Sequence, residues 1–490
     1  MKISSFTKPS NSFSGNVLKL MSGTVLAQAL GVLAMPIVTR LFAPEAFGVA
    51  AVFSSMTGIV GVVACLRYEI AIMLPESSEE AANILGVSLL SVILMTFLTI
   101  LIVWLGGEQI IRLLHAPQLK HYLWLVPIAI FFQGIFLALN YWNTRTKHFG
   151  RLSVAKVISS VTADATKLAA GFLGFVSAGI LIGTLMLKNI LSMVILGGQI
   201  WREDKNLFVK NIRWKAIGKG FIRYKKFLIF ETWAGLLNSI SSQLPALMLS
   251  SFFSIPIVGF YSLGLMIVQM PLILISGALS QVFYQKASQN KNTQEGNKVL
   301  VEKLLDLLIF YAILPVMIFA ITGEELFSVL FGETWREAGR YTQILSPYIF
   351  FTFISSPLSS LFAVYERQGT ALFLQSLIFI TRLLSLYIGG VYQNIHLALG
   401  LFSITGVFVY GAYALLNIRF ANASVRNVSL TFMKYFIYYL PAGICLFFIK
   451  YVLQLDHIIL LTAALSLCAF YFFVFRRKYF SLLPKKGFFR

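Results

Sequence analysis

Long apolar runs separated by short polar segments dominate the pattern along the chain. Each run extends for about twenty residues, the length with which an α-helix crosses the hydrocarbon core of a bilayer. The runs are continuously apolar, whereas the strands of a membrane barrel alternate, so the pattern predicts helices. We expect fourteen membrane-spanning helices, near residues 17–39, 45–66, 82–105, 122–140, 152–175, 177–200, 227–253, 257–283, 304–322, 341–364, 371–391, 396–416, 432–450 and 457–475.

The composition agrees with this pattern. Of the 490 residues, 58% are hydrophobic and 12% are charged, which is about half of the charged fraction of a soluble protein. The predicted fold class is therefore all-α, a polytopic membrane bundle of about 14 transmembrane helices. The chain contains no P-loop, H-E-x-x-H or C-x-x-C motif, so we expect no ATP hydrolysis, no metal site and no cofactor.

The formal net charge of +21 is distributed unevenly over the predicted loops. Of the 40 Lys and Arg residues, 29 fall on the side that holds both termini, 6 on the opposite side and 5 within the spans. Positive charge marks the cytoplasmic side of a membrane protein. We therefore expect both termini in the cytoplasm and interpret the charge as an orientation signal, not as a nucleic-acid-binding surface.

The densest basic segment comprises residues 201–226, where nine Lys and Arg residues accompany Glu203 and Asp204. We interpret this segment as a solvated loop that sets the orientation of the chain. Contact with anionic lipid headgroups is the alternative interpretation.

Polar and small residues line one face of the fifth predicted span. Within about 80° on a helical wheel lie Lys156, Ser160, Asp164 and Lys167, and the face continues through Gly171 and Gly174. An ionisable group costs about 2.5–3.5 kcal/mol at the centre of a membrane helix, so we expect this face to meet a cavity or another helix. Neutralisation of Asp164 by Lys167, three residues later, is the alternative.

Two more cations lie near the middle of predicted spans, Lys188 in the sixth and Arg382 in the eleventh. With Lys156 and Lys167 they outnumber Asp164, the clearly deep acid. Buried positive charge is stable only beside an anion or water, and a guanidinium suits phosphate geometry. We predict an aqueous central cavity for an anionic, phosphate-bearing substrate. In the alternative, Lys156 reaches the cytoplasm and Lys188 pairs with Asp164, which leaves Arg382 unexplained.

The first span is unusually polar, with Gln28 among small residues ahead of Pro36. Small residues permit close packing and proline permits bending. Helix packing and the cavity explain Gln28 equally well.

A polar, proline-containing helix followed by a short turn and a glycine occurs twice. The two copies comprise Pro36, Pro44 and Gly48, then Pro245, Pro256 and Gly259. Both proline-containing helices would run outward, so the repeats would be parallel. We expect two six-helix lobes, residues 1–226 and 227–431, and two additional helices in residues 432–490.

Several short motifs resemble those of a known family. They are Ser22-Gly23, Gln28, Pro36, Arg40-Leu-Phe-x-Pro44-x-x-x-Gly48, Arg67-Tyr68-Glu69-x-Ala71 and Pro256-x-x-Gly259-x-Tyr261. The chain thus resembles the Wzx-type polysaccharide and O-antigen flippases of the multidrug/oligosaccharidyl-lipid/polysaccharide (MOP) exporter superfamily. The resemblance implies a transporter, not an enzyme. Its substrate would be an undecaprenyl-diphosphate-linked oligosaccharide, moved from the inner to the outer leaflet of the bacterial cytoplasmic membrane. The implied partners are this lipid-linked glycan, the lipid bilayer, a polysaccharide polymerase and other assembly proteins.

This resemblance suggests alternating access of the two lobes, with the deep cations offsetting the diphosphate. Arg67 and Glu69 would gate the cytoplasmic end, and Arg40 would be an outer gate residue or a helix-end anchor. An inside-negative membrane potential favours export of an anion. Asp164 and Glu231 are the candidates for carrying a proton on the return step.

Three other classes stay open. A cation-coupled multidrug exporter of the same superfamily would place acids in its cavity, where this chain has mainly cations. A membrane glycosyltransferase or polysaccharide polymerase would need a sizeable outer loop, and the longest outer segment predicted is residues 323–340, with Glu324, Glu325, Glu333 and Glu337. A lipid scramblase without glycan preference is the third.

Overall fold

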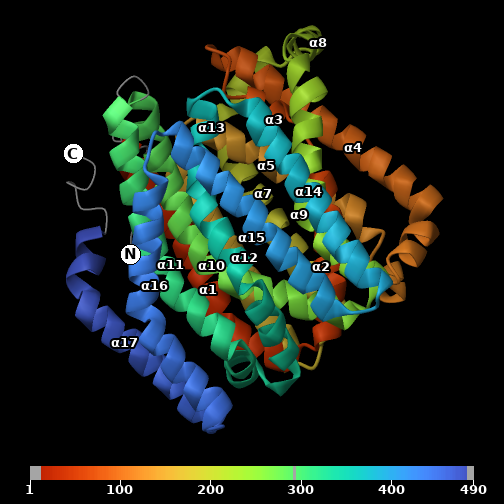
Figure 1. Cartoon of the computed structure of the whole chain (residues 1–490). Helices are drawn as coiled ribbons and strands as arrows, with labels where there is room; N and C mark the ends of the chain where they lie inside the picture. The colour runs from red at the N-terminus through yellow and green to blue at the C-terminus, as the bar shows by residue number, and fades with distance from the viewer. Residues whose placement is uncertain (1–12, 291–293, 483–490) are drawn as a thin grey trace, which may run out of the picture. The chain divides into compact units, whose positions relative to one another are not determined.

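A computed structural model describes residues 13–290 and 294–482, and within these ranges the regular structure is helical throughout (Figure 1). This confirms the all-α prediction. Each of the fourteen predicted spans overlaps a helix of eighteen residues or more. These helices are α1 (Phe13–Leu41), α2 (Pro44–Gly61), α4 (Ser78–Leu113), α5 (Leu125–Arg145), α6 (Phe149–Phe172), α7 (Ala178–Asn211), α9 (Thr232–Phe252), α10 (Ile255–Gln289), α11 (Gln294–Phe331), α12 (Arg336–Leu358), α14 (Gln368–Val391), α15 (Ile395–Phe420), α16 (Val425–Phe447) and α17 (His457–Leu482).

Shorter helical turns join the long helices. They are α3 (Tyr68–Ala71), η2 (Pro117–His121), α8 (Trp214–Arg223), η3 (Phe227–Glu231), η4 (Glu333–Trp335), α13 (Leu361–Val364) and η5 (Phe448–Val452). The basic tail predicted after residue 475 lies partly outside the described residues.

Among the described helices, nine are long and apolar enough to cross a membrane, namely α4, α5, α7, α11, α12, α14, α15, α16 and α17. Within their most apolar stretches, 22–61% of the residues are buried, so lipid has to cover the remainder. The chain is therefore a multi-pass membrane protein. α6 carries Lys156, Asp164 and Lys167, and α9 carries Asn238 and Gln243, so composition alone does not mark these two as spans. That all fourteen helices cross the membrane stays a prediction.

The chain divides into two compact units, residues 1–262 and 263–490. In the first unit, α1 packs on α6, α6 on α7, α5 on α4 and α7, and α9 on α2. Its apolar core gathers around Trp142, Ile84 and Leu196. In the second unit, α12 packs on α11 and α15, α14 on α15, and α16 on α11, around Phe310, Tyr435 and Tyr439. The functional lobes predicted at residues 1–226, 227–431 and 432–490 stay a prediction.

The repeated proline–glycine turn has a structural counterpart in the first unit. Gly48 is the fifth residue of α2, and Gly259 is the fifth residue of α10. A Cβ on Gly48 would overlap the carbonyl of Ile255, and a Cβ on Gly259 would overlap the carbonyl of Pro44. The two helix starts thus touch reciprocally, backbone against backbone, which only glycine allows.

Towards the C-terminal end of α2, α9 packs against α2 through polar and small residues. Ser239 Oγ donates a hydrogen bond of 2.9 Å to the Gly58 carbonyl, and Thr232 Oγ1 donates one of 3.1 Å to the Leu66 carbonyl. We call this contact between α2, α9 and the start of α10 the α2–α9 seam.

Two predicted loops are helical instead. Residues 323–340 continue α11 to Phe331, turn at Gly332 with φ of 105°, and enter η4 and α12. Residues 201–226 continue α7 to Asn211 and then form α8. In the first segment, charged pairs three residues apart, such as Glu333 with Arg336, favour the helix beyond the apolar run.

The substitution Gly48→Ala should lower the thermal unfolding midpoint of the purified chain, because the added methyl group forces α2 away from α10. Gly106→Ala in α4 is the matched control, since nothing lies within 4 Å of a Cβ there, and alanine is intrinsically better than glycine in a helix by about 1 kcal/mol. Thermal unfolding in detergent measures both effects. A midpoint for Gly48→Ala at or above that of Gly106→Ala would contradict the close approach.

Candidate functional site

The polar face of α6 lies inside the first unit, against α1 and α7. Lys167 Nζ and Asp164 Oδ1 form an ion pair at 2.9 Å. A Cβ on Gly31 of α1 would lie 3.6 Å from Asp164 Oδ2, so α1 approaches this carboxylate closely. One turn earlier on α1, Gln28 has a buried side-chain oxygen that accepts no hydrogen bond. The structure thus brings Asp164 and Lys167 together beside α1, one turn along that helix from Gln28.

Lys188 of α7 completes this group, which we call the lysine cluster: Lys156, Asp164, Lys167 and Lys188. Lys188 lies within electrostatic range of Asp164 and Lys167, and Lys156 lies within range of Lys188. A hydrogen bond of 2.9 Å between Ser192 and Ser159 ties α7 to α6.

The lysine cluster carries excess positive charge. Asp164 takes Lys167 as its ion-pair partner, and among the described residues no ion pair is formed by Lys156 or Lys188. The alternative pairing of Lys188 with Asp164 is therefore not the one observed. Lys167 and Lys188 lie near the one carboxylate of the cluster, Lys156 lies near Lys188, and the formal charge of the four groups is positive.

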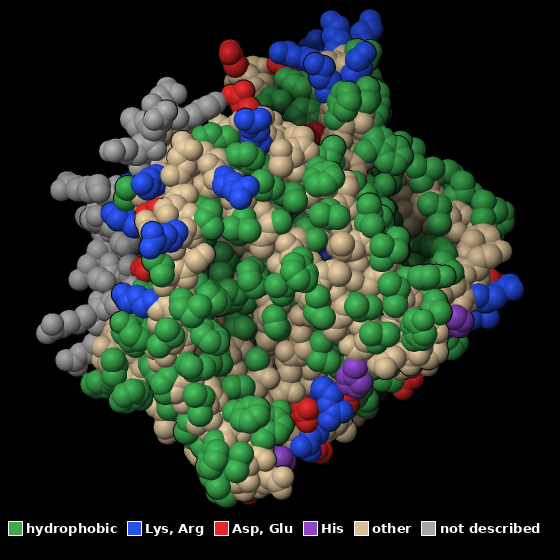
Figure 2. All heavy atoms as spheres, in the orientation of Figure 1, with side chains coloured by type: hydrophobic (Ala, Val, Ile, Leu, Met, Phe, Trp, Pro, Cys, Tyr) green, Lys and Arg blue, Asp and Glu red, His purple; other side chains and the backbone are tan. Residues whose placement is uncertain are grey.

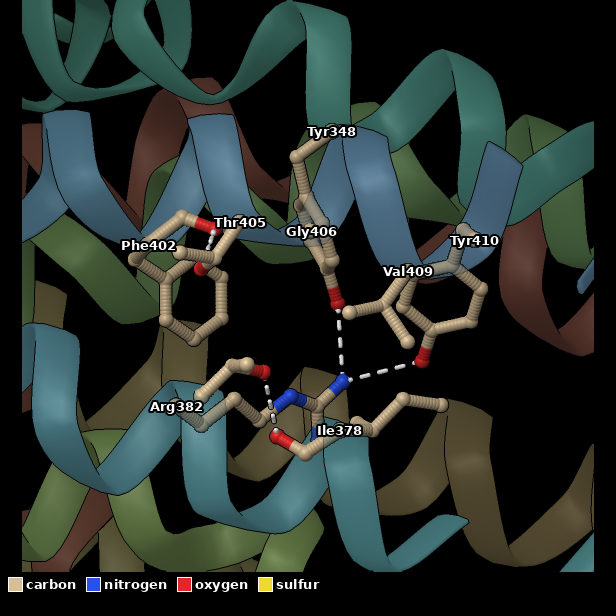
Figure 3. Close-up of a pocket in the computed structure, with 9 residues that line it drawn as sticks. Tyr348, Ile378, Arg382, Phe402, Thr405, Gly406, Val409 and Tyr410 are labelled. Atoms are coloured by element: carbon tan, nitrogen blue, oxygen red, sulfur yellow. Dashed lines mark hydrogen bonds between the residues drawn. The ribbon is translucent and has the colours of Figure 1, made fainter. Parts of the chain in front are cut away.

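Arg382 lies in a small pocket of the second unit, between α12, α14 and α15 (Figure 3). Its Nη2 donates hydrogen bonds of 3.0 Å to the Tyr348 hydroxyl and 3.1 Å to the Tyr410 hydroxyl. The guanidinium also lies 5.7 Å from the ring centroid of Phe402. These three contacts, two hydrogen bonds to hydroxyl groups and one contact with an aromatic face, fix the direction of the guanidinium.

Sequence reasoning identified Arg382 but missed Tyr348 and Tyr410. The chain has 20 tyrosines, and both of these lie in apolar runs where nothing distinguishes them from interfacial residues. Their role follows only from packing, because Gly406 of α15 leaves room for the Tyr348 ring.

The segment between α2 and α4 holds a buried acid. Leu66 and Arg67 have φ of 50° and 64°, a conformation that costs non-glycine residues free energy and gathers at functional sites. The Glu69 side chain is fully buried, and no other residue donates a hydrogen bond to its carboxylate oxygens. Arg67 Nη1 lies 3.7 Å from Glu69 Oε1, and the same guanidinium touches Gly235 of α9. Arg67 and Glu69 thus lie at one end of the α2–α9 seam.

Arg40 and Glu231 are both exposed. Arg40 lies in the last turn of α1, where its Nη1 donates a hydrogen bond of 3.0 Å to the Pro36 carbonyl, the contact expected of a cation at a helix C-terminus. Glu231 ends η3, directly before α9, and so lies outside the polar middle of that helix.

The four acids considered for a catalytic role in residues 323–340 all form ion pairs. Glu324 pairs with Arg336 and Arg340, and Glu325 pairs with Lys450 of η5 at 2.9 Å. The remaining pairs join Glu333 to Arg336 and Glu337 to Arg340. This network ties α11 to α12 and η5, which gives these acids a structural explanation.

Comparison with solved structures identifies proteins of similar fold. Over 94% of this chain and 99% of the other, it is similar to the lipid II flippase MurJ in an inward-closed conformation, with 14% identity and a TM-score of 0.71. Over 82% of this chain and 95% of the other, it is similar to an inward-facing multidrug resistance transporter of the MATE family in the MOP superfamily, with 16% identity and a TM-score of 0.63. A MOP-superfamily transporter from Pyrococcus furiosus gives 15% identity and a TM-score of 0.55, over 82% of this chain and 94% of that one.

These similarities show that the chain has the fold of the solved MurJ and MATE structures of the MOP superfamily. The family model described as "polysaccharide biosynthesis protein" matches residues 37–340. The chain belongs to this family of polysaccharide biosynthesis proteins. A search of curated proteins gives no match.

The opening of the α2–α9 seam at the Glu69 end should depend on pH. Burial raises the pKa of Glu69 from 4.5 to about 7, and the nearby Arg67 offsets only part of this effect. Cys65 and Tyr141 of α5 are the other titratable groups within range. Glu69 binds its proton more tightly in the closed seam than in an open, hydrated one. The closed seam is therefore stabilised as pH falls from about 7 towards 4.5, and the ratio of closed to open molecules rises by up to about tenfold per pH unit.

Distances between spin labels at the exposed positions Glu79 and Trp233 would measure this opening at pH 5 and pH 8. The wild-type distribution should shift to longer distances at the higher pH, because ionised Glu69 favours hydration. Glu69→Gln, which stays neutral, should show no shift. A pH-independent wild type, or the same shift in the Gln variant, would contradict the assignment.

Proposed function

We propose that the chain is a flippase that moves an undecaprenyl-diphosphate-linked oligosaccharide across the membrane for surface polysaccharide biosynthesis. The observation that carries this proposal is the excess positive charge of the lysine cluster. Lys156 and Lys188 form no ion pair with an acid among the described residues. Such an arrangement suits a ligand that brings negative charge of its own, and a diphosphate does so.

Arg382 supports the same substrate class. Its guanidinium donates hydrogen bonds to two hydroxyl groups, which set its direction in the pocket. An arginine held in this way suits a phosphate oxygen better than a lysine would. The substrate-binding residues of this proposal are therefore Gln28, Lys156, Asp164, Lys167, Lys188 and Arg382.

The transport cycle would be alternating access. The α2–α9 seam would separate during the cycle, with Arg67 and Glu69 as gate residues at one end and the glycine contact at the other. Arg40 would anchor the outer end of α1 or act in the outer gate. An inside-negative membrane potential contributes about 2.3 kcal/mol per charge per 100 mV to outward movement of an anion. Asp164 and Glu231 are the candidates for proton coupling on the return step.

The cellular setting of the proposal follows from the charge distribution and the substrate. The chain would reside in the bacterial cytoplasmic membrane with both termini in the cytoplasm, because the basic loops lie on that side. A polysaccharide polymerase and other assembly proteins would receive the glycan, which would become O-antigen of lipopolysaccharide or another surface polymer. The glycan-bearing lipid and the surrounding bilayer would be the direct partners.

A multidrug exporter is the competing function within the same superfamily, and one solved structure of similar fold is a multidrug resistance transporter. The charge of the lysine cluster disfavours it, because three lysines beside one carboxylate repel a cationic drug. The scramblase alternative predicts transfer of ordinary phospholipids as well. A polymerase would instead leave single repeat units outside the cell.

Complementation of a deletion strain tests the flippase directly. Arg382→Ala and Lys188→Ala should each slow transfer of the lipid-linked oligosaccharide about tenfold or more, as expected when a charge-assisted contact worth about 1.5–3 kcal/mol is lost. The readouts are surface glycan and the leaflet that holds the diphosphate-linked oligosaccharide. Lys120→Ala, an exposed cation on η2, is the control that should leave transfer unchanged.

The outcomes separate the alternatives. Oligosaccharide trapped on the cytoplasmic leaflet supports the flippase, and cationic dyes accumulating with normal surface glycan would replace it with the drug exporter. Tyr410→Phe removes one acceptor from Arg382 and should slow transfer less than Arg382→Ala does. Equal transfer by wild type, Arg382→Ala and Lys188→Ala at equal expression would remove both cations from the substrate path.

A further inference from the structure

The helix α8 is strongly amphipathic and lies between two long helices, α7 and α9. It carries the middle of the basic segment at residues 201–226, a segment that the transport proposal does not use. Lys and Arg side chains gather over α8 at the top of the space-filling view (Figure 2). Exposed basic residues on and beside it are Lys210, Arg213, Lys215, Lys219, Arg223, Lys225 and Lys226.

One face of α8 is fixed to the first unit. Gly220 is buried, and a Cβ there would lie 2.6 Å from Ile84 of α4. The Phe221 ring stacks on Tyr68 with centroids 5.4 Å apart. At the entry to the helix, Asn83 of α4 accepts a hydrogen bond of 3.1 Å from the Arg213 amide and donates one of 3.0 Å to the Asn211 carbonyl. α8 is therefore held in a defined orientation.

The apolar arc of α8 is wider than the strip that the protein covers. At 100° per residue, the covered positions 217, 220 and 221 span about 100°, and Trp214 and Ile222 extend the apolar arc by roughly another 100°. Trp214 is 77% exposed and Ile222 is 66% exposed. Lys215 and Lys219 follow directly on the helical wheel, on the side away from the covered strip.

This order of residues matches a helix that lies in a membrane interface. A tryptophan and an isoleucine enter the boundary between headgroups and acyl chains, and the adjacent lysines stay at headgroup level. Arg223 does not contribute, because Glu80 of α4 takes it as an ion-pair partner at 2.6 Å. Lys215 and Lys219 have no ion-pair partner among the described residues.

We propose that the outer face of α8, formed by Trp214, Lys215, Lys219 and Ile222, is a binding site for the anionic headgroups of bilayer phospholipids. Charge complementarity selects the occupant, since two lysines without an ion-pair partner among the described residues lie beside an exposed apolar face. The site is separate from the lysine cluster of α6 and α7 and does not depend on which substrate is transported.

Binding at α8 would bear on the segment that holds Glu69. The Tyr68 hydroxyl donates a hydrogen bond of 3.0 Å to the Phe221 carbonyl, and Tyr68 lies between Arg67 and Glu69 in the chain. A headgroup that steadies α8 therefore steadies α3 through the ring stack and this hydrogen bond.

Lysine footprinting of the full chain in nanodiscs tests the site. We expect Lys215 and Lys219 to react about fivefold more slowly with an amine reagent in discs containing phosphatidylglycerol than in discs of phosphatidylcholine alone. Lys120 on η2 is the internal control and should react equally in both. Equal reactivity of Lys215 and Lys219 in the two discs, or an equal change at Lys120, would overturn the proposal.

Two variants and one soluble anion sharpen the test. The double variant Lys215→Gln/Lys219→Gln should lose the thermal stabilisation that phosphatidylglycerol gives the wild type, and Lys215→Arg/Lys219→Arg should keep it. Inorganic phosphate added to phosphatidylcholine discs should not protect the lysines, and protection by phosphate would overturn the assignment to lipid. Slower hydrogen exchange of residues 66–71 with phosphatidylglycerol, in wild type only, supports the link to α3, and unchanged exchange would refute that link.

Discussion

The high free energy of an ionised group in a hydrocarbon environment governs this structure. Every charge at membrane depth has to be paired, hydrated or offset by a ligand, and the two units meet this requirement in different ways. In the first unit Asp164 pairs with Lys167, and Lys188 and Lys156 lie beyond that pair without an ion-pair partner among the described residues. In the second, hydroxyl groups and an aromatic ring orient a guanidinium. Away from these places, buried charges are neutralised locally, as Glu325 is by Lys450.

The same requirement explains the polarity of the helix contacts. α2 and α9 meet through hydroxyl groups bonded to carbonyls and through glycines, not through charged pairs. Such contacts hold two helices together at modest strength, which suits a seam that has to separate. Glu69 is an exception at this seam, because it is fully buried without a hydrogen-bond donor from another residue. Its pKa is raised because a carboxylate is unfavourable where water is excluded.

The sequence pattern was sufficient for the long helices, and the roles of the charged candidates stay predictions. Apolar runs located every long helix, because lipid leaves a chain few other ways to satisfy its backbone. The ion pair of Asp164 and Lys167, which the sequence offered as the alternative to a cavity-facing carboxylate, is formed in the structure. The pattern did not predict the helical structure of two polar segments, residues 201–226 and 323–340. In these segments, charge pairs and packing extend the helices beyond the apolar runs. Tyr348 and Tyr410 could not be found at all, since their partner Arg382 lies on a different helix and no spacing links them.

The reciprocal contact of Gly48 and Gly259 has a consequence for how the chain can vary. Gly48 of the first turn contacts the backbone of the second turn, and Gly259, the equivalent residue of the second turn, contacts the backbone of the first. The contact is thus symmetric, as in an isologous interface. The atoms that a Cβ would overlap belong to backbone carbonyls, which no substitution can remove. A larger residue at either glycine therefore has no compensating side-chain change on the opposite turn, and suppressors of such a mutation have to come from residues that shift a whole helix.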